Sequence, residues 1–238
     1  MAKPMPSTPP AAPPVQHLVV RYAKRGKMRF ASHLDVARAF ERCVRRAGLP
    51  IAFSSGFTPH PKISYAGGAP TGVASEAEYL SLGLSIRSDA EAVREQLNAA
   101  LPDGIKVIDV TDAVGGLPTG QLTASEWRVT LPGLPPQAVA PAVEAFLALE
   151  HAPVERLTSK GVRRMDARTA VVSLEVDDDA AGPGSTALRM IVRHTVPAVR
   201  PDDVLTALRD FTDVTPDGPP LMTRLAQGSI GESGVVMP

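Results

Sequence analysis

The sequence predicts an α+β protein built from two similar halves, and three observations lead to this prediction. Alternating apolar runs and amphipathic helical runs follow the order β-α-β-β-α-β in residues 15–114 and again in residues 121–226. A glycine-rich linker, residues 115–120, separates the two runs. The length of 238 residues suits two small domains. Because this element order is that of the ferredoxin-like motif, we expect two tandem ferredoxin-like halves with antiparallel sheets.

The first half begins with an alternating segment that fits a strand, or a hairpin turning at Arg25-Gly26. Ser32 is a good N-cap for the next helix, predicted over 33–47, with Asp35 at the N3 position of a capping box. Gly48 and Pro50 would end this helix. The other elements of this half are expected as strands beginning at 51 and 78, a helix over 89–101 and a strand over 105–114.

The second half repeats this pattern with different residues. Pro201 suits the first turn of its second helix, and the acidic Asp202 and Asp203 suit the positive end of the helix dipole. We expect strands over 126–132, 169–176, 186–195 and 221–228, and helices over 135–150 and 201–211. The proline-rich residues 1–14 are expected to form a disordered tail, and residues 227–238 to be frayed.

Composition excludes several classes of protein. The single cysteine, Cys43, rules out an intrachain disulfide, a cysteine-based zinc site and an iron–sulfur cluster held by this chain alone. No apolar run approaches the length of a membrane span, and the N-terminus has no apolar signal segment. We therefore expect a cytoplasmic protein without a cofactor, in which Cys43 packs as a small apolar side chain.

The net charge of zero hides a strong asymmetry along the chain. Residues 21–62 hold ten Lys and Arg against only Asp35 and Glu41, and residues 156–168 hold five against Asp166. Such segregation favours a polyanionic partner, since a local positive field attracts polyanions while the average stays neutral. The alternative is that these cations cover exposed surface or pair with acidic segments brought close by folding.

RNA is the polyanion that the pattern favours. Clustered Lys and Arg bind phosphate backbones, and the candidates of the first half are Arg29, Arg38, Arg42, Arg45, Arg46 and Lys62. In the second half, Lys160, Arg163, Arg164 and Arg168 would extend the same groove if the halves pack side by side. The aromatic residues Tyr22, Phe30, Phe57 and Tyr65 are interleaved with the first group, and we expect Phe30 to belong to the core. The loop at Gly56 and Phe57, with Tyr65, would stack a nucleotide.

Two histidines, His33 and His60, are candidate catalytic residues. With Lys62 they would supply the base, acid and cation that metal-independent RNA cleavage needs. The alternative is structural: His33 bonds to Asp35 at the helix start, and His60 closes a turn between prolines. Neither histidine has a recognised metal-ligand spacing to Cys43, Glu76 or Glu78.

Residues 28–84 resemble the radical-SAM-linked protein family. The motif that carries this resemblance consists of Arg29-Phe30, Ser32-His33-Leu34-Asp35, Arg38, Arg45-Arg46, Pro50, Ser54, Gly56-Phe57, Pro59-His60-Pro61-Lys62, Gly72 and Glu78. The second half matches more loosely, through "RRMDARTAV", so the resemblance covers about 17–225.

This resemblance implies a conserved domain of unknown function, often fused behind or encoded beside a radical SAM enzyme. The present chain is then a stand-alone member without a radical SAM domain, because one cysteine cannot hold the cluster. Members are commonly found near ribonuclease E/G genes, which implies an RNA-related role. The architecture is also similar to that of CRISPR repeat-processing endoribonucleases, although a fold does not fix a function.

The expectations about function are therefore ordered. The first is a bacterial RNA-binding or RNA-modification accessory protein that uses a basic groove. A metal-independent endoribonuclease using His33 and His60 is the second, although no complete catalytic motif is present. A docking module for a separately encoded radical SAM enzyme or ribonuclease is the third.

Overall fold

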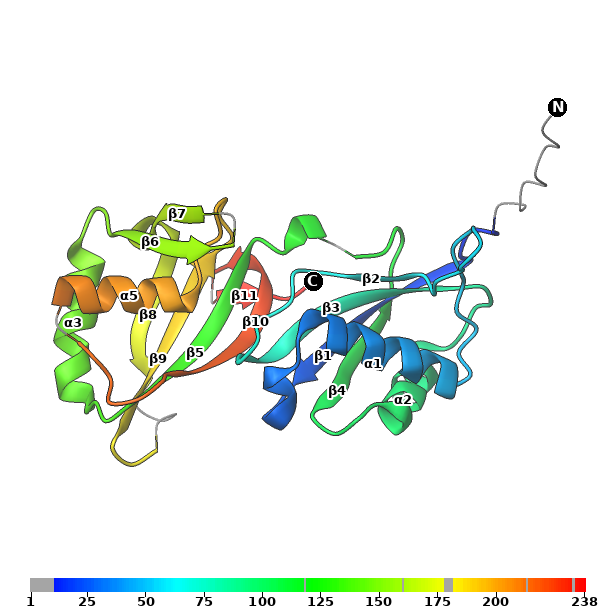
Figure 1. Cartoon of the computed structure of the whole chain (residues 1–238), viewed down its shortest axis with the longest axis horizontal. Coiled ribbons are helices and arrows are strands. Elements are labelled where there is room, and N and C mark those ends of the chain that lie inside the picture. Colours follow the sequence, from blue (N-terminus) through cyan, green and yellow to red (C-terminus); the bar gives the residue numbers. More distant parts are fainter. Residues whose placement is uncertain (1–10, 118, 160, 178–181, 213, 233) are drawn as a thin grey trace. The chain divides into compact units, whose positions relative to one another are not determined.

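The computed structural model describes residues 11–117, 119–159, 161–177, 182–212, 214–232 and 234–238 (Figure 1). The chain divides into two units. Unit 1 comprises the described residues up to Gly72 together with Ala77–Leu117, and unit 2 comprises Val73–Glu76 with the described residues from Thr119 onward. The boundary near residue 117 lies inside the glycine-rich linker that separates the two predicted halves.

Unit 1 contains a sheet with the strand order β4-β1-β3-β2, in which β1 is antiparallel to β4 and β2 is antiparallel to β3. Its elements, in chain order, are β1 (Gln16–Lys24), the 3-10 helix η1 (Gly26–Phe30), α1 (His33–Arg46), β2 (Ile63–Tyr65), β3 (Ala74–Leu84), α2 (Ala90–Ala100) and β4 (Ile105–Asp112). The β3 strand begins in unit 2, where Ala74 and Ser75 pair in parallel with β10.

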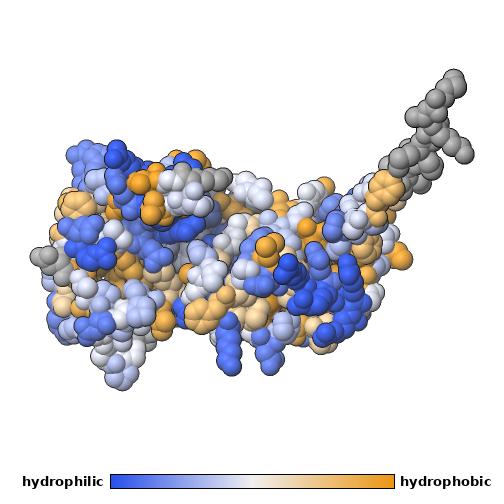
Figure 2. All heavy atoms as spheres, in the orientation of Figure 1, coloured by the Kyte–Doolittle hydropathy of each residue, from blue (hydrophilic) through white to orange (hydrophobic). Residues whose placement is uncertain are grey.

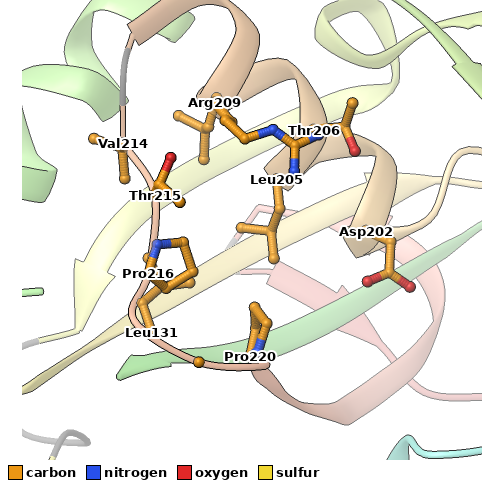
Figure 3. Close-up of a pocket in the computed structure, with 11 residues that line it drawn as sticks. Leu131, Asp202, Leu205, Thr206, Arg209, Val214, Thr215, Pro216 and Pro220 are labelled. Carbon is orange, nitrogen blue, oxygen red and sulfur yellow. The ribbon is translucent and has the colours of Figure 1, made fainter. Parts of the chain in front are cut away.

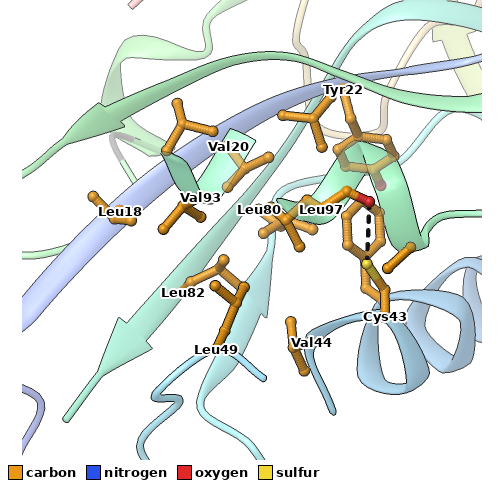
Figure 4. Packing of buried hydrophobic residues seen from close by; sticks show 14 of the residues in the cluster. Leu18, Val20, Tyr22, Cys43, Val44, Leu49, Leu80, Leu82, Val93 and Leu97 are labelled. Atoms are coloured by element: carbon orange, nitrogen blue, oxygen red, sulfur yellow. Dashed lines mark hydrogen bonds between the residues drawn. The ribbon is translucent and has the colours of Figure 1, made fainter. Parts of the chain in front are cut away.

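The core of unit 1 lies between its sheet and its two helices. Alternate residues of β1 and β3 point to the same side as the apolar stripes of α1 and α2, and they pack into one cluster (Figure 4). Phe40 of α1 and Leu97 of α2 are fully buried there. Cys43 belongs to this cluster, and burial raises the pKa of its thiol to about 11, against a smaller opposing effect of Arg46. Cys43 therefore packs as an inert side chain.

The start of α1 shows why this helix begins where the sequence predicts. The Ser32 hydroxyl accepts the N–H of Asp35 at 3.2 Å, and the Asp35 carboxylate accepts the N–H of Ser32 at 3.0 Å. The predicted capping box is thus present. At the other end, Gly48 has a φ of 65°, which favours glycine and ends the helix.

Unit 2 contains a sheet with the strand order β10-β5-β9-β8, whose neighbouring strands are all antiparallel. Its elements are η2 (Thr119–Gln121), β5 (Ala124–Pro132), α3 (Pro136–Ala148), β6 (Pro153–Thr158), β7 (Gly161–Asp166), α4 (Ala167–Ala170), β8 (Val171–Asp177), β9 (Ser185–Arg193), α5 (Pro201–Thr212), β10 (Leu221–Gly231) and β11 (Gly234–Val236). The β6–β7 hairpin forms a separate two-stranded sheet, and β11 pairs with β10.

The predicted α+β class with mainly antiparallel strands is confirmed, while several predicted elements differ. No hairpin turns at Arg25-Gly26, because the chain enters η1 directly after β1. The strand expected from residue 51 is reduced to two isolated bridges, Ile51 with Leu84 and Phe53 with Pro61. Residues 227–238 were expected to fray, but the described ones include the end of β10 and all of β11.

The N-terminal tail was expected to be disordered over 1–14. Its first ten residues lie outside the described part of the chain. From Ala11 onward the chain contacts unit 1, since the N–H of Ala11 donates to Ser55 Oγ at 2.7 Å and the N–H of Val15 donates to the Leu84 carbonyl. Among the described helices, none is both long and apolar enough to cross a membrane.

Candidate nucleic-acid interface

Four arginines of α1, namely Arg38, Arg42, Arg45 and Arg46, form what we call the α1 arginine face. All four are exposed, while the opposite side of the helix packs in the core. Figure 2 shows hydrophilic side chains gathered over this helix. Within the part of the chain that the structure describes, no carboxylate lies within ion-pair distance of these guanidinium groups. Their charge is therefore available to a polyanion.

The arginine face also acts on the helix start and on the neighbouring helix. The pKa of Asp35 is lowered mainly by the Ser32 side-chain and backbone hydrogen bonds, and further by the positive charges of Arg38 and Arg42. Arg46 donates from Nη1 to the Ala100 carbonyl at 3.4 Å, next to a cavity of about 120 Å³ between α1 and α2. Arg46 thus braces α2, whereas Arg38, Arg42 and Arg45 extend into solvent.

Arg29, predicted as a phosphate ligand, holds the backbone through its Nε. Its Nε donates to the Gly72 carbonyl at 2.7 Å, and the Gly72 N–H donates back to the Arg29 carbonyl at 2.8 Å. The guanidinium group also lies 5.7 Å from the ring centre of Phe30. Lys62 is half-buried, and its side chain packs against Gly83 in β3. Of the two, Arg29 is a positioning residue for the segment that ends at Gly72.

The segment 66–72, which we call the glycine loop, is clamped by two buried charged residues. Lys24, only 3% exposed, donates from Nζ to the carbonyls of Ala69 and Pro70 at 3.2 and 3.3 Å. Glu78, only 4% exposed, accepts the N–H of Ala69 at 2.9 Å. Lys24 of β1 thus binds two carbonyls of the loop, and Glu78 of β3 binds one of its N–H groups. These two strands therefore fix the shape of the loop.

His33 and Tyr65 complete this cluster. Gly68 lies beside both side chains, since a Cβ atom at this position would be in van der Waals contact with Glu78 Oε2 and His33 Nδ1, at 3.4 and 3.5 Å. The rings of His33 and Tyr65 meet edge to face with centroids 5.2 Å apart. Tyr65 donates to the Ala37 carbonyl at 3.4 Å, and burial raises the pKa of its phenol. Tyr65 thus packs against α1 and helps to hold the helix in place.

Sequence reasoning did not single out Lys24, and it placed Glu78 at the start of a strand without the clamping role. A signal for Lys24 was present, because it continues the inward alternation of Leu18, Val20 and Tyr22 along β1. A lysine at an inward register position requires a buried partner.

His60 lies at the other end of β2 from His33. Tyr65, which contacts His33, is the last residue of β2 and pairs with Leu80 of β3. Before β2, the N–H of Gly83 donates to the Lys62 carbonyl, and Ile51 forms a bridge with Leu84. His33 therefore lies at the start of α1 beside the end of β2, and His60 lies in the loop before β2. The endoribonuclease hypothesis stays a prediction.

The loop that carries His60 is braced at its base. The N–H of Ser54 donates to the His60 carbonyl at 2.9 Å, and the N–H of His60 donates to Ser54 Oγ at 3.0 Å. Gly56 has a φ of 122°, a conformation that other residues rarely adopt. Phe57, which follows it, is 85% exposed. The loop therefore presents Phe57 to solvent from a fixed base.

Two expectations about aromatic residues are wrong. Phe30 was expected in the core but is 67% exposed, because η1 buries none of its residues and turns the chain toward α1. Tyr22 was a candidate for stacking but is 3% exposed and packs edge to face on Phe40. Among the described residues of unit 1, Phe30 and Phe57 are the phenylalanines most exposed to solvent.

In unit 2, two of the predicted phosphate ligands are engaged within the fold. Arg168 donates from Nε to the Leu147 carbonyl at 3.1 Å and from Nη1 to the Val171 carbonyl at 3.2 Å. Arg164 donates to Glu155 at 2.7 Å across the β6–β7 hairpin. Arg163 is exposed on β7, and Lys160 lies outside the described residues. Arg168 therefore has a structural role, and its binding of phosphate stays a prediction.

The model of one protein family matches residues 17–201, which is more than half of the chain. The chain belongs to this family. Its description is "Uncharacterized protein conserved in bacteria (DUF2344)", which confirms the prediction of a bacterial domain of unknown function. The link of DUF2344 to radical SAM enzymes stays a prediction. A search of curated proteins finds no match to the sequence.

Among solved structures, the chain is similar to one chain in "Crystal Structure of a Cbf5-Nop10-Gar1 Complex", with a TM-score of 0.51 and 10% identity. The alignment covers 97% of this chain and 58% of that chain, so this DUF2344 member spans little more than half of its length. At this identity the likeness concerns the fold alone, and it agrees with an α+β class.

Two peroxidase structures align less well. They are "DypB N246A in complex with manganese", with 87% of this chain and 86% of that one covered, and the encapsulated DyP-type peroxidase from Mycobacterium smegmatis, with 93% and 94% covered. Both are 13% identical to this chain with a TM-score of 0.23, which supports no structural argument.

Proposed function

We propose that this DUF2344 protein binds single-stranded RNA along α1, gripping phosphates with the α1 arginine face. The observation that carries the proposal is that four exposed arginines share one side of a helix whose other side is core, with no carboxylate of the described residues paired to them. A solvated face ordinarily mixes both signs of charge. The helix has 14 residues and is therefore about 21 Å long, enough to contact several consecutive phosphates.

The choice of a single strand rests on the exposed rings of Phe30 and Phe57. A phenylalanine side chain that stays in water lacks the stabilisation of about 1.5–3 kcal/mol that burial would give, so an exposed ring on a braced loop indicates a binding function. Unpaired bases stack on such rings, whereas a duplex keeps its bases stacked inside. Phe30 lies just before the start of α1, and the loop of Phe57 follows its end. An RNA strand along α1 would thus meet an aromatic ring near either end.

The proposal extends to the fold and to the role of the protein. We infer that each unit is a ferredoxin-like domain, since β4-β1-β3-β2 and β10-β5-β9-β8 are the same order once the hairpin and α4 of unit 2 are set aside as an insertion. Sheet-and-helix domains of this kind are common RNA binders. We propose an accessory role, in which the protein holds RNA for a separate enzyme.

The first test measures RNA affinity as a function of salt by fluorescence anisotropy with a short labelled RNA that cannot pair with itself. The logarithm of the affinity should fall with the logarithm of salt with a slope of roughly −0.7 per phosphate contacted. The double variant Arg42→Glu, Arg45→Glu should bind about a hundredfold more weakly, because two charge-assisted contacts become repulsive. Arg46 is left intact because it braces α2.

The control is the double variant Arg87→Glu, Lys106→Glu, which makes the same charge change on exposed residues of unit 1 outside α1, where Arg87 pairs with Asp112 at 3.6 Å. This control should bind within about threefold of the parent protein. Equal losses in both double variants would show a nonspecific field effect, and salt-independent binding would contradict the proposal. A protein partner that is retained after nuclease treatment, with no RNA affinity, would favour the docking alternative.

The second test concerns stacking. Phe57→Ala should weaken binding of the single strand by about 1–3 kcal/mol, the usual contribution of one stacked base, while Phe57→Trp should retain it. The same RNA annealed to its complement should bind more weakly than the single strand and should not distinguish these variants. If Phe57→Ala binds as the parent does, the strand does not stack on this loop.

A further inference from the structure

Unit 2 contains a cavity of about 320 Å³ between α5 and the segment 214–220 (Figure 3). The size falls within the range of small-molecule sites. One wall is the side of α5 that carries Asp202, Leu205, Thr206 and Arg209, and the facing wall is the segment 214–220. Leu131 at the end of β5 also lines it. The cavity is far in sequence from α1, and no step of the RNA proposal uses it.

The facing wall is held in place by the end of β5. The N–H of Asp217 donates to the Pro132 carbonyl at 3.1 Å. The space where a side chain of Gly133 would lie is filled by the Asp217 carboxyl group, and Gly133 has a φ of 76°. Prolines at 216, 219 and 220 further restrict this segment. The cavity is therefore largely preformed, which lowers the entropic cost of binding a ligand.

Opposite charges stand at the two ends of the α5 wall. Asp202 and Arg209 are seven residues apart, or about 10 Å along the helix axis. Leu205 and Thr206 lie between them, and Figure 3 shows Leu205 directed into the space between the walls. The arrangement is an apolar floor with a carboxylate at one end and a guanidinium group at the other.

The fold does not use the Asp202 carboxylate. Its neighbour Asp203 caps α5 by accepting the N–H of Arg200 at 2.7 Å, and Asp203 also pairs with Arg156. Within the described residues, no hydrogen bond or ion pair engages the Asp202 side chain, whereas Arg209 contacts only its neighbour Asp210, at 3.5 Å. Partial burial, and then the charge of Asp203, raise the pKa of Asp202, while the charges of Arg200 and Arg156 act to lower it. A ligand cation beside Asp202 would lower this pKa, because it would stabilise the charged carboxylate against both burial and the charge of Asp203.

We propose that this cavity binds a short zwitterion with an apolar body, with its ammonium group at Asp202 and its carboxylate at Arg209. A dipeptide of two apolar residues has this chemistry.

The test is a calorimetric titration of the full chain with leucyl-leucine, supported by amide chemical shifts. Binding in the millimolar range is expected, with shifts confined to α5 and residues 214–220. Acetyl-leucyl-leucine lacks the ammonium group and leucyl-leucine amide lacks the carboxylate, so each should bind about fivefold more weakly. Asp202→Asn should remove the preference over the acetylated peptide, and Arg209→Gln the preference over the amide.

Matched controls are Glu144→Gln on α3 and Arg193→Gln on β9, which change the same charges on exposed residues outside the cavity. Both should keep the two preferences. The proposal is overturned if leucyl-leucine does not bind, if the capped peptides bind equally well, or if the shifts map elsewhere. Because the readouts are in unit 2, none of these results bears on RNA binding by α1.

Discussion

The two basic segments of the chain look alike in sequence but do different things in the structure. In the first, α1 directs its arginines to solvent, and no carboxylate of the described residues pairs with them. In the second, residues 156–168, Arg156 pairs with the buried Asp203, Arg164 pairs with Glu155, and Arg168 bonds to two backbone carbonyls. The arginines of α1 face solvent, whereas most arginines of residues 156–168 form contacts that stabilise unit 2.

The difference teaches that charge density alone does not identify a binding surface. On α1, the arginines occupy the side of an amphipathic helix opposite a filled apolar stripe, and that geometry directs them away from the core. On a hairpin, cross-strand neighbours such as Glu155 and Arg164 lie side by side, and charges of opposite sign are brought together. Helical periodicity is therefore the better predictor of free charge.

The largest expected effect that tests this contrast is on stability. Arg156→Ala would leave the carboxylate of Asp203, which is 4% exposed, without its partner. We expect the free energy of unfolding to fall by about 3 kcal/mol, because removing one member of a buried pair strands the other charge. Chemical denaturation followed by circular dichroism measures this.

The matched variant for this measurement is Arg42→Ala on α1. Because Arg42 is exposed and pairs with no carboxylate of the described residues, the free energy of unfolding should stay within about 0.5 kcal/mol of the parent value. Equal destabilisation by the two changes would show that α1 arginines are structural after all, and the contrast between the segments would be lost.

The smallest effect concerns two aspartates that cap helices in these segments. Asp35 caps α1, and its pKa is lowered by Ser32 and then by Arg38 and Arg42. Burial acts to raise the pKa of Asp166, which caps α4, but hydrogen bonds from Ala152, His151 and Thr169 outweigh it, and this pKa is also lowered.

Carboxyl titration by NMR separates the two segments. Arg42→Ala should raise the pKa of Asp35 and leave that of Asp166 unchanged, whereas His151→Ala should do the reverse. Both pKa values lie below their unfolded values near 3.9, so each group stabilises the fold above that pH and loses this contribution as the pH falls through the folded pKa. If the pKa of Asp35 is the same in the Arg42→Ala variant and in the parent protein, the Arg42 guanidinium group lies farther from Asp35 than it does in the structure.

Local rules predicted much of the fold from the sequence. The Ser32–Asp35 capping box, the apolar stripe of α1 and the start of α5 at Pro201 depend on neighbouring residues alone, and all three are present. The β6–β7 hairpin was missed because its many arginines obscure the alternation that would indicate strands. The short β2 strand was missed because its three residues are defined only by their pairing with β3.

The candidate site was predicted less completely, since it depends on contacts between distant residues. The exposure of α1 arginines follows from helical periodicity and could be foreseen. The clamp of Lys24 and Glu78 on the glycine loop could not, because β1 and β3 meet only in the folded sheet.

The β3 strand has a consequence for how this chain can be made and divided. Its first residues pair with β10, which follows much later in the chain, so Ala74 and Ser75 cannot pair with β10 until that strand has left the ribosome. During that interval the start of β3 is an open strand edge inside an otherwise completed domain. A fragment cut at the linker would keep that edge permanently, and expression of the first half alone should therefore favour aggregation.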